Sequence, residues 1–178
     1  MRHVLAVTGT PGTGKTALTA ALCERVEESE SHSVASLAEW CGAIAEHPDG
    51  TGARDVDVEM MSESWPNLRS RFSSGLILID GHLSHHLPVD GVVFLRCRPD
   101  VLRRRLKARG WSNAKVEENV EAEFISSIAA DLVGGPVPCF EIASHDAVVN
   151  ITDEVVTWME AGLPSAGPSL DWFEEGVR

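Results

Sequence analysis

The segment Gly9–Thr16 has the residue types and the spacing of a phosphate-binding loop. Its sequence, GTPGTGKT, matches the pattern G-x-x-x-x-G-K-[ST] in full, between an apolar run at 3–8 and an amphipathic segment at 15–28. These flanking patterns disfavour a chance match to a Gly-rich turn. Backbone N–H groups of such a loop, together with the positive end of the next helix, surround phosphate oxygens. We expect Lys15 to reach the β- and γ-phosphates of ATP, Thr16 to ligate Mg²⁺, and nucleotide contacts from Gly12, Thr13, Gly14, Lys15 and Thr16.

The apolar run at 76–79 ends in Asp80. In P-loop proteins a carboxylate at the end of a second buried strand helps to hold Mg²⁺ and its water shell, so we expect this role for Asp80. An ordinary turn aspartate is the alternative. We expect His82 to hydrogen-bond a water or the γ-phosphate, with a solvated loop as an alternative. A metal site that includes His85 and His86 is less favoured, because no Cys or carboxylate cluster accompanies these histidines at ligand spacing.

Half of the arginines in the chain lie between residues 96 and 109. Arginine forks suit phosphoryl oxygens and can spread transition-state charge. Arg105 and Arg109 lie one turn apart on a predicted helix, and Arg109 stands at a break that is typical of a small lid. We expect both to contact the nucleotide, and Arg109 to complete a catalytic set with Lys15, Asp80 and His82. For Arg103 and Arg104 we favour a solvated face that pairs with Glu117, Glu118, Glu121 and Glu123.

About 45 residues separate the first helix from the run at 76–80, which is enough for a helix pair that binds a phosphate acceptor. Arg54 is the only basic residue between Arg25 and Arg69, so this region offers little positive charge for tight binding of a monophosphate. The acidic cluster at 55–59 could bind ribose or base edges. Its alternative interpretation is the solvated start of a helix.

Continuous apolar strands that alternate with helices predict an α/β fold, with a parallel sheet covered on both faces. Strands are expected at 3–8, 76–80, 92–96 and, more weakly, 139–143. Helices are expected at 15–28, 36–46, 57–72 with a break near Trp65-Pro66, 99–109, 113–132 and 152–161. We expect one domain over 1–161, and a Gly-, Pro- and Ser-rich tail over 162–178 that is mobile or a docking segment.

The composition favours a single cytoplasmic domain. The chain has 178 residues and a hydrophobic share of 43%, which is enough for one substantial core. No apolar run reaches the length of a membrane span, and no secretory signal is expected before the first strand. The four cysteines are widely scattered, so we expect reduced thiols rather than disulfides or zinc knuckles.

The charge balance is strongly acidic. Twenty-seven acidic residues face 15 basic ones, of which only three are lysines, and the formal net charge is −12. This balance is typical of a protein adapted to high salt, although an ordinary acidic protein is the alternative. It predicts no direct, tight binding to naked nucleic acid.

The phosphate-binding loop and several later motifs together resemble the adenylate kinase isoenzyme six family, over about residues 3–161. The charge balance suggests a haloarchaeal member. After the loop the resemblance rests on SVASLA at 33–38, DGH at 80–82, VFLRCRPDVLRRRLKARGW at 93–111 and NVEAE at 119–123. The segment RLKARGW is the most distinctive of these.

This resemblance implies a P-loop fold of the nucleoside monophosphate (NMP) kinase type, with an NMP-binding region at about 33–56 and a short lid at about 108–118. It implies phosphoryl transfer from ATP to AMP or another NMP with Mg²⁺, intrinsic ATPase activity, and a role in late small-subunit rRNA maturation through a platform ribosomal protein. Matched nucleotide positions include Ala17 and Arg109. The family often carries Arg where this chain has Glu39, and this departure favours ATPase over kinase activity.

Three functions therefore stay open. The first is an NMP kinase, the second an assembly factor whose nucleotide state sets its affinity for a ribosomal protein, and the third a kinase of another small acceptor. The first two can coexist. The discriminating observation is whether AMP raises ADP production far above the rate with ATP alone.

Overall fold

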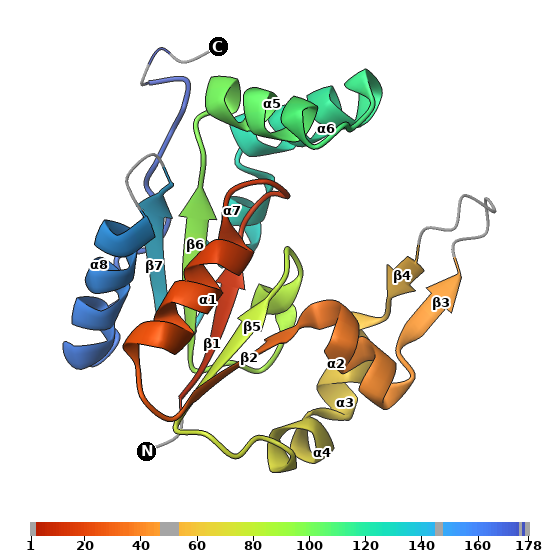
Figure 1. The fold of residues 1–178 in the computed structure, drawn as a ribbon, viewed down its shortest axis with the longest axis vertical. Coiled ribbons are helices and arrows are strands. Elements are labelled where there is room, and N and C mark those ends of the chain that lie inside the picture. Colours follow the sequence, from red (N-terminus) through yellow and green to blue (C-terminus); the bar gives the residue numbers. More distant parts are fainter. Residues whose placement is uncertain (1–2, 47–53, 145–147, 175, 177–178) are drawn as a thin grey trace.

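The computed structural model describes residues 3–46, 54–144, 148–174 and 176, and its centre is a five-stranded sheet. The strand order is β2-β5-β1-β6-β7, and every neighbouring pair is parallel. The predicted fold class, an α/β protein with a parallel sheet, is confirmed (Figure 1). The strands are β1 (His3–Thr8), β2 (Ser29–Ser33), β5 (Leu76–Asp80), β6 (Gly91–Arg96) and β7 (Cys139–Ala143).

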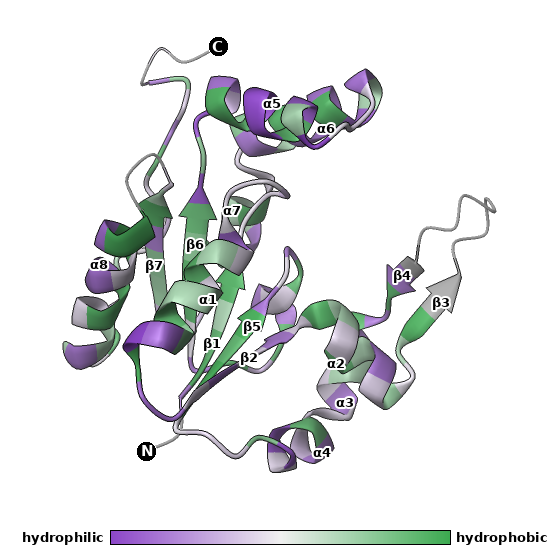
Figure 2. Cartoon of the chain, viewed as in Figure 1, coloured by the Kyte–Doolittle hydropathy of each residue, from purple (hydrophilic) through white to green (hydrophobic). Residues whose placement is uncertain are grey.

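Helices cover both faces of this sheet, because alternate strand residues point to opposite sides and both sets are apolar. One face packs on α1 (Lys15–Arg25) and α8 (Val148–Glu160). The other packs on α2 (Val34–Cys41), α3 (Val58–Glu63), α4 (Trp65–Ser70) and α7 (Ser127–Leu132). Figure 2 shows β1, β5 and β6 as hydrophobic, as expected for strands buried on both faces.

Two further helices form a separate layer beyond the end of β6. α5 (Pro99–Ala108) and α6 (Asn113–Phe124) pack through a small apolar cluster of their own, which includes Leu102, Leu106, Val116 and Val120. The turn between these helices holds Arg109 and Gly110, and Gly110 has a φ of 76°. The predicted break after Arg109 is confirmed, and it separates two short antiparallel helices (Figure 1).

Several element predictions were wrong for local reasons. β2 has the sequence SESHS, which carries no apolar signal because this strand lies at the edge of the sheet. The helix predicted at 36–46 ends at Cys41, where Gly42 adopts the left-handed conformation, and β3 (Ile44–Glu46) then pairs with β4 (Arg54–Val56). The helix predicted at 113–132 divides at Ser126, whose φ is 56°. The break near Trp65-Pro66 is confirmed between α3 and α4.

The segment after α8 is packed against the domain in part. Trp172 is 1% exposed, and its indole Nε1 donates to Glu123 Oε1 at 3.1 Å. The backbone N–H groups of Ser169 and Leu170 both donate to Glu141 Oε2. Of the two interpretations of the tail, the docking segment fits these contacts. No helix within the described ranges is long and apolar enough to cross a membrane.

Candidate active site

The phosphate-binding loop leaves β1 and enters α1 at the carboxyl edge of the sheet. Gly9 has a φ of 145°, and a Cβ at this position would lie 2.2 Å from the Leu95 carbonyl oxygen. Gly14 is the residue before α1 and has a φ of 109°. Both positions therefore require glycine, and the loop can wrap closely around a ligand with its N–H groups pointing inward.

Lys15, the first residue of α1, folds its ammonium group back onto the loop. Its Nζ donates to the Gly9 carbonyl at 2.8 Å and to the Thr10 carbonyl at 3.1 Å. Burial lowers the pKa of Lys15 to about 8, with Arg109 adding to this effect and Asp80 opposing it. A half-buried cation whose two hydrogen bonds go to carbonyl groups is suited to an anionic ligand, because a phosphate would add a close charge partner.

Thr16 and Asp80 meet beside this lysine. The Thr16 hydroxyl donates to Asp80 Oδ2 at 2.5 Å, across 64 residues of sequence. The meeting follows from sheet topology, since Asp80 ends β5 and pairs in register with Val7 on β1, just before the loop. Two adjacent oxygen ligands of this kind suit Mg²⁺, which prefers one or two protein oxygens together with water and substrate phosphates. The residues therefore fit the predicted metal role.

His82 lies in the loop that follows β5, just beyond Asp80. Its side chain is exposed, and surrounding protein atoms together with the Lys15 ammonium lower the pKa of this imidazole. The neutral ring can therefore accept or donate a hydrogen bond near the phosphate site at neutral pH. Its predicted catalytic role stays a prediction.

A second group of predicted residues lines a cavity of about 270 Å³ beside the loop. Its walls include Gly12, Gly14 and Ala17 from the loop and α1, and Arg105 and Arg109 from α5 and its end. These predicted nucleotide contacts thus come together in one place, although they are far apart in sequence. Further lining residues are Thr13, Leu18, Leu95, Ser144, Val148 and Ile151.

The two arginines in this cavity differ in their partners. Arg105 donates to the Thr13 carbonyl at 3.2 Å and to the Ser144 carbonyl at 2.9 Å, so it braces the loop against the end of β7. Arg109 is exposed at the end of α5. Arg109 is thus placed to approach a phosphate, whereas Arg105 already holds the loop in position.

The sequence analysis missed a buried ionic cluster behind the loop. Glu123 is 2% exposed; its Oε2 accepts from Thr10 Oγ1 at 2.6 Å and its Oε1 from Arg96 Nε at 2.8 Å. Arg96 is fully buried and also donates to Glu141 Oε1 at 2.7 Å. Glu123 had been assigned to a solvated face, and this was wrong. In the sequence, only the NVEAE motif at 119–123 distinguishes Glu123 from the other glutamates of this helix.

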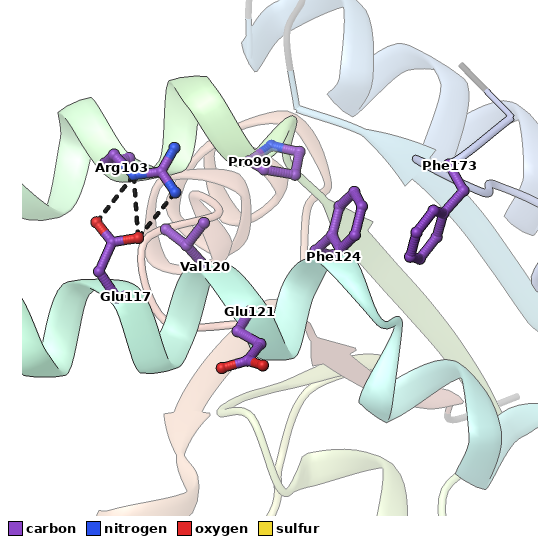
Figure 3. A pocket seen from close by; sticks show the side chains of 7 residues that line it. All are labelled: Pro99, Arg103, Glu117, Val120, Glu121, Phe124 and Phe173. Atoms are coloured by element: carbon purple, nitrogen blue, oxygen red, sulfur yellow. Dashed lines mark hydrogen bonds and ion pairs between the residues drawn. The ribbon is translucent and has the colours of Figure 1, made fainter. Parts of the chain in front are cut away.

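The outer face of α5 and α6 carries a different cavity, of about 470 Å³ (Figure 3). Its walls include Phe124 and Phe173, whose ring centroids lie 4.1 Å apart. Arg103 Nη2 donates to Glu117 Oε2 at 2.8 Å across its rim. The predicted solvated pairing of Arg103 is confirmed. Arg104 instead pairs with Asp100, at 3.1 Å.

A wider cavity of about 660 Å³ lies on the acceptor side, between α3 and the loop after β5. Its lining includes Glu59, Glu63 and His86 together with Val56, Val58, Ser62 and Leu83. None of these lining residues is Lys or Arg. Asp57 from the acidic cluster caps α3, because its Oδ1 accepts from Met60 N at 2.9 Å. The side chain of Arg54 and residues 47–53 lie outside the described part of the structure.

This strand–loop–helix, with a lysine, a hydroxyl and a second-strand carboxylate at one sheet edge, defines a P-loop protein of the kinase-like type. The family model described as "AAA domain" matches residues 5–126. Similar proteins named "Putative adenylate kinase" occur in Archaeoglobus fulgidus, at 37% identity over 97% of this chain and 93% of the relative, and in Thermococcus onnurineus, at 34% identity over 97% and 92%. The chain therefore belongs to the AAA domain family and to the family of archaeal proteins named as putative adenylate kinases.

Solved structures agree on the fold. A sugar kinase from Janibacter superposes with a TM-score of 0.59 at 12% identity, over 93% of this chain and 99% of that one. The protein TT1252 from Thermus thermophilus superposes with a TM-score of 0.55 at 16% identity, over 92% and 99%. At these identities the likeness concerns the fold alone.

Proposed function

We propose that this chain is an adenylate kinase-type phosphotransferase, which transfers the γ-phosphoryl group of ATP to AMP and has intrinsic ATPase activity. The observation that carries the proposal is the convergence of Lys15, Thr16 and Asp80 at one edge of the sheet. The Mg²⁺ that Thr16 and Asp80 would hold neutralises developing charge on the phosphates when bound. The similarity to proteins named as adenylate kinases supports the choice of acceptor.

In this proposal the residues act by positioning and by charge. The loop N–H groups and Lys15 hold the β- and γ-phosphates, while Arg109 approaches from the lid to stabilise the charge that spreads over the transferred group. An AMP phosphate oxygen attacks the γ-phosphorus, the bond to the β-phosphate oxygen breaks, and two ADP molecules result. His82 would position the attacking group or a water beside the γ-phosphate.

The test is ADP production with and without AMP. We expect AMP to raise the rate far above that with ATP alone, and Lys15→Ala to abolish both rates while the circular dichroism spectrum stays that of the wild type. Arg104→Ala is the matched control, because Arg104 pairs with Asp100 on the surface. An unchanged rate on AMP addition would exclude AMP as the acceptor, and full turnover by Lys15→Ala would exclude the site.

A second candidate function is an ATPase that serves as an assembly factor in small-subunit maturation. The observation that favours it is the acceptor-side cavity, whose lining, among the residues that the structure describes, has two glutamates and no lysine or arginine. A strongly acidic chain would attract a basic ribosomal protein of the platform and repel free rRNA. The lid around Arg109 would couple the bound nucleotide to this partner, because it joins α5 to the acidic helix α6.

Capture of purified archaeal platform proteins with ATP, ADP or no nucleotide tests this second function. We expect one-to-one capture that depends on the nucleotide, and Arg109→Ala should weaken both turnover and that dependence. Arg104→Ala again serves as the control. Equal capture in all three states, or no capture, would leave only the metabolic kinase.

A further inference from the structure

The loop after β5 and helix α7 bring two histidines and one aspartate together outside the phosphate site. His85 and His86 lie in a short 3-10 helix, η1 (Ser84–His86), and Asp131 lies near the end of α7. One ligand atom from each residue lies within 4.8 Å of the others. In the sequence, metal binding is disfavoured because no Cys or carboxylate cluster accompanies the histidines at ligand spacing. The fold supplies that carboxylate from 46 residues further along the chain.

Thr8 fixes the orientation of the His85 ring. The His85 side chain is 2% exposed, and its Nδ1 lies 2.9 Å from Thr8 Oγ1. The Thr8 hydroxyl has a single proton, which it donates to the His82 carbonyl at 3.1 Å. When its oxygen accepts from His85 Nδ1–H, the proton of the neutral ring is on Nδ1. In that tautomer Nε2 carries a lone pair that can bind a cation.

That lone pair faces a carboxylate. His85 Nε2 lies 3.4 Å from Asp131 Oδ2, and in the tautomer with the proton on Nδ1 a cation between these two atoms would bind both. The His85 and His86 ring centroids are only 4.0 Å apart, so two charged imidazoles would repel each other.

The two distances from Asp131 to the histidines suit a tetrahedral metal. Two ligands at about 2.0–2.1 Å from such a metal lie roughly 3.4 Å from each other. The distance from Asp131 Oδ2 is 3.4 Å to His85 Nε2 and 3.8 Å to His86 Nε2. A metal-binding histidine usually forms a hydrogen bond through its other ring nitrogen, and the contact between Thr8 Oγ1 and His85 Nδ1 fills that place here.

We propose that His85 Nε2, His86 Nε2 and Asp131 Oδ2 form a binding site for a divalent transition metal of the Zn²⁺ type. Two imidazoles and one carboxylate favour such a metal over Mg²⁺, which prefers oxygen ligands. Three protein ligands leave the fourth coordination position of a tetrahedral metal open for water or for an atom of a bound small molecule. His86 also lines the acceptor-side cavity, so an exchangeable position would lie at the margin of that cavity.

The site is tested by titrating Zn²⁺ alone into full-length protein that has been stripped with a chelator, with millimolar Mg²⁺ in the buffer. We expect one Zn²⁺ per chain at this site. Asp131→Asn and His86→Gln should each weaken binding about tenfold or more. The matched control is Asp153→Asn, because Asp153 is an exposed helical aspartate that pairs with Arg25. Asp131 and Asp153 side chains are 52% and 61% exposed, so both substitutions should be tolerated by the fold.

Co²⁺ provides a spectroscopic readout that is independent of phosphoryl transfer. Wild-type protein should develop the visible bands of tetrahedral Co²⁺ without a thiolate charge-transfer band, and Asp131→Asn should lose these bands. Zn²⁺ should also raise the Tm of the wild type and of Asp153→Asn but not that of Asp131→Asn. Absence of binding, equal affinity in Asp131→Asn, or thiolate bands from the four free cysteines would each overturn the proposal.

Discussion

Glu123 accepts a 2.6 Å hydrogen bond from Thr10 Oγ1, which ties helix α6 to the phosphate-binding loop across 113 residues of sequence. The same carboxylate accepts from Arg96 Nε, from the backbone N–H of Cys97 and from the Trp172 indole. One buried anion therefore connects the loop, the end of β6, helix α6 and the C-terminal segment. Its position explains why the C-terminal segment is packed rather than free.

Glu123→Gln should destabilise the fold and disturb the loop. The substitution leaves Arg96 buried with only one of its two carboxylate partners, and loss of a buried partner costs about 3–5 kcal/mol. Denaturant unfolding should report this loss, and the KM for ATP should rise because Thr10 loses its charged acceptor. Glu117→Gln is the control, since it changes an exposed pair with Arg103 and should leave the unfolding free energy almost unchanged. Equal stabilities for the two variants would contradict the role of Glu123.

Asp80→Asn should raise the Mg²⁺ concentration needed for half-maximal activity and lower turnover about 100-fold. The physical reason is that Asp80 supplies the negative charge beside the Thr16 hydroxyl, whereas an amide keeps the shape and loses the charge. Nucleotide affinity without metal should change much less. A Mg²⁺ activation curve that matches the wild type would show that Asp80 is only a turn residue.

The sequence was sufficient to predict the parts of the fold that carry a local apolar signal. β1, β5 and β6 are continuous apolar runs because helices cover both of their faces. β2 could not be found in this way, because its residues are polar and its pairing with β5 is set by the chain around it. Gly42 could have indicated the end of α2, since glycine commonly follows the last helical turn.

The residues of the candidate site also differ in whether a local sequence pattern predicts them. The positions of the loop and Thr16 can be predicted from a short motif. The position of Asp80 beside them can be predicted because the carboxyl ends of parallel strands lie at one edge of the sheet. The partnership of Glu123 with Thr10 and that of Asp131 with His85 depend on how distant elements pack, and no local pattern encodes them. Arg105 was expected at the nucleotide, and its contacts with Thr13 and Ser144 add a bracing role.

ATP affinity should fall as the pH rises above 8. Burial lowers the pKa of Lys15 to about 8 in the free protein, so the ammonium that attracts the phosphates is lost above this pH. The dissociation constant should rise by up to about tenfold per pH unit. Calorimetric titration between about pH 7 and about pH 9.5 measures this, and Lys15→Ala should bind weakly with no such slope. If the dissociation constant of the wild type does not change over this pH range, the pKa of Lys15 lies outside it.

The lowered pKa of Lys15 also makes the free energy of unfolding depend on pH. The unfolded chain holds the Lys15 proton more tightly, with a pKa of 10.5, than the folded protein does. Lys15 by itself therefore disfavours folding below pH 8, and this penalty fades as the pH rises towards 10.5. Nucleotide binding should remove part of the penalty, because phosphate oxygens raise the pKa of the ammonium.

Potassium chloride should raise the Tm of this protein up to molar concentrations. With a net charge of −12, the folded chain carries acidic self-repulsion, and 1 M salt shortens the Debye length to about 3 Å. The double variant Glu118→Gln/Glu121→Gln removes two exposed charges from α6, and it should have the higher Tm at low salt and a shallower dependence on salt. Chloride is the better choice of anion, because sulfate would strengthen apolar burial in any protein. A Tm that is flat or falls with salt, or an unchanged slope in the double variant, would contradict stabilisation by charge screening and remove the basis for a salt-adapted protein.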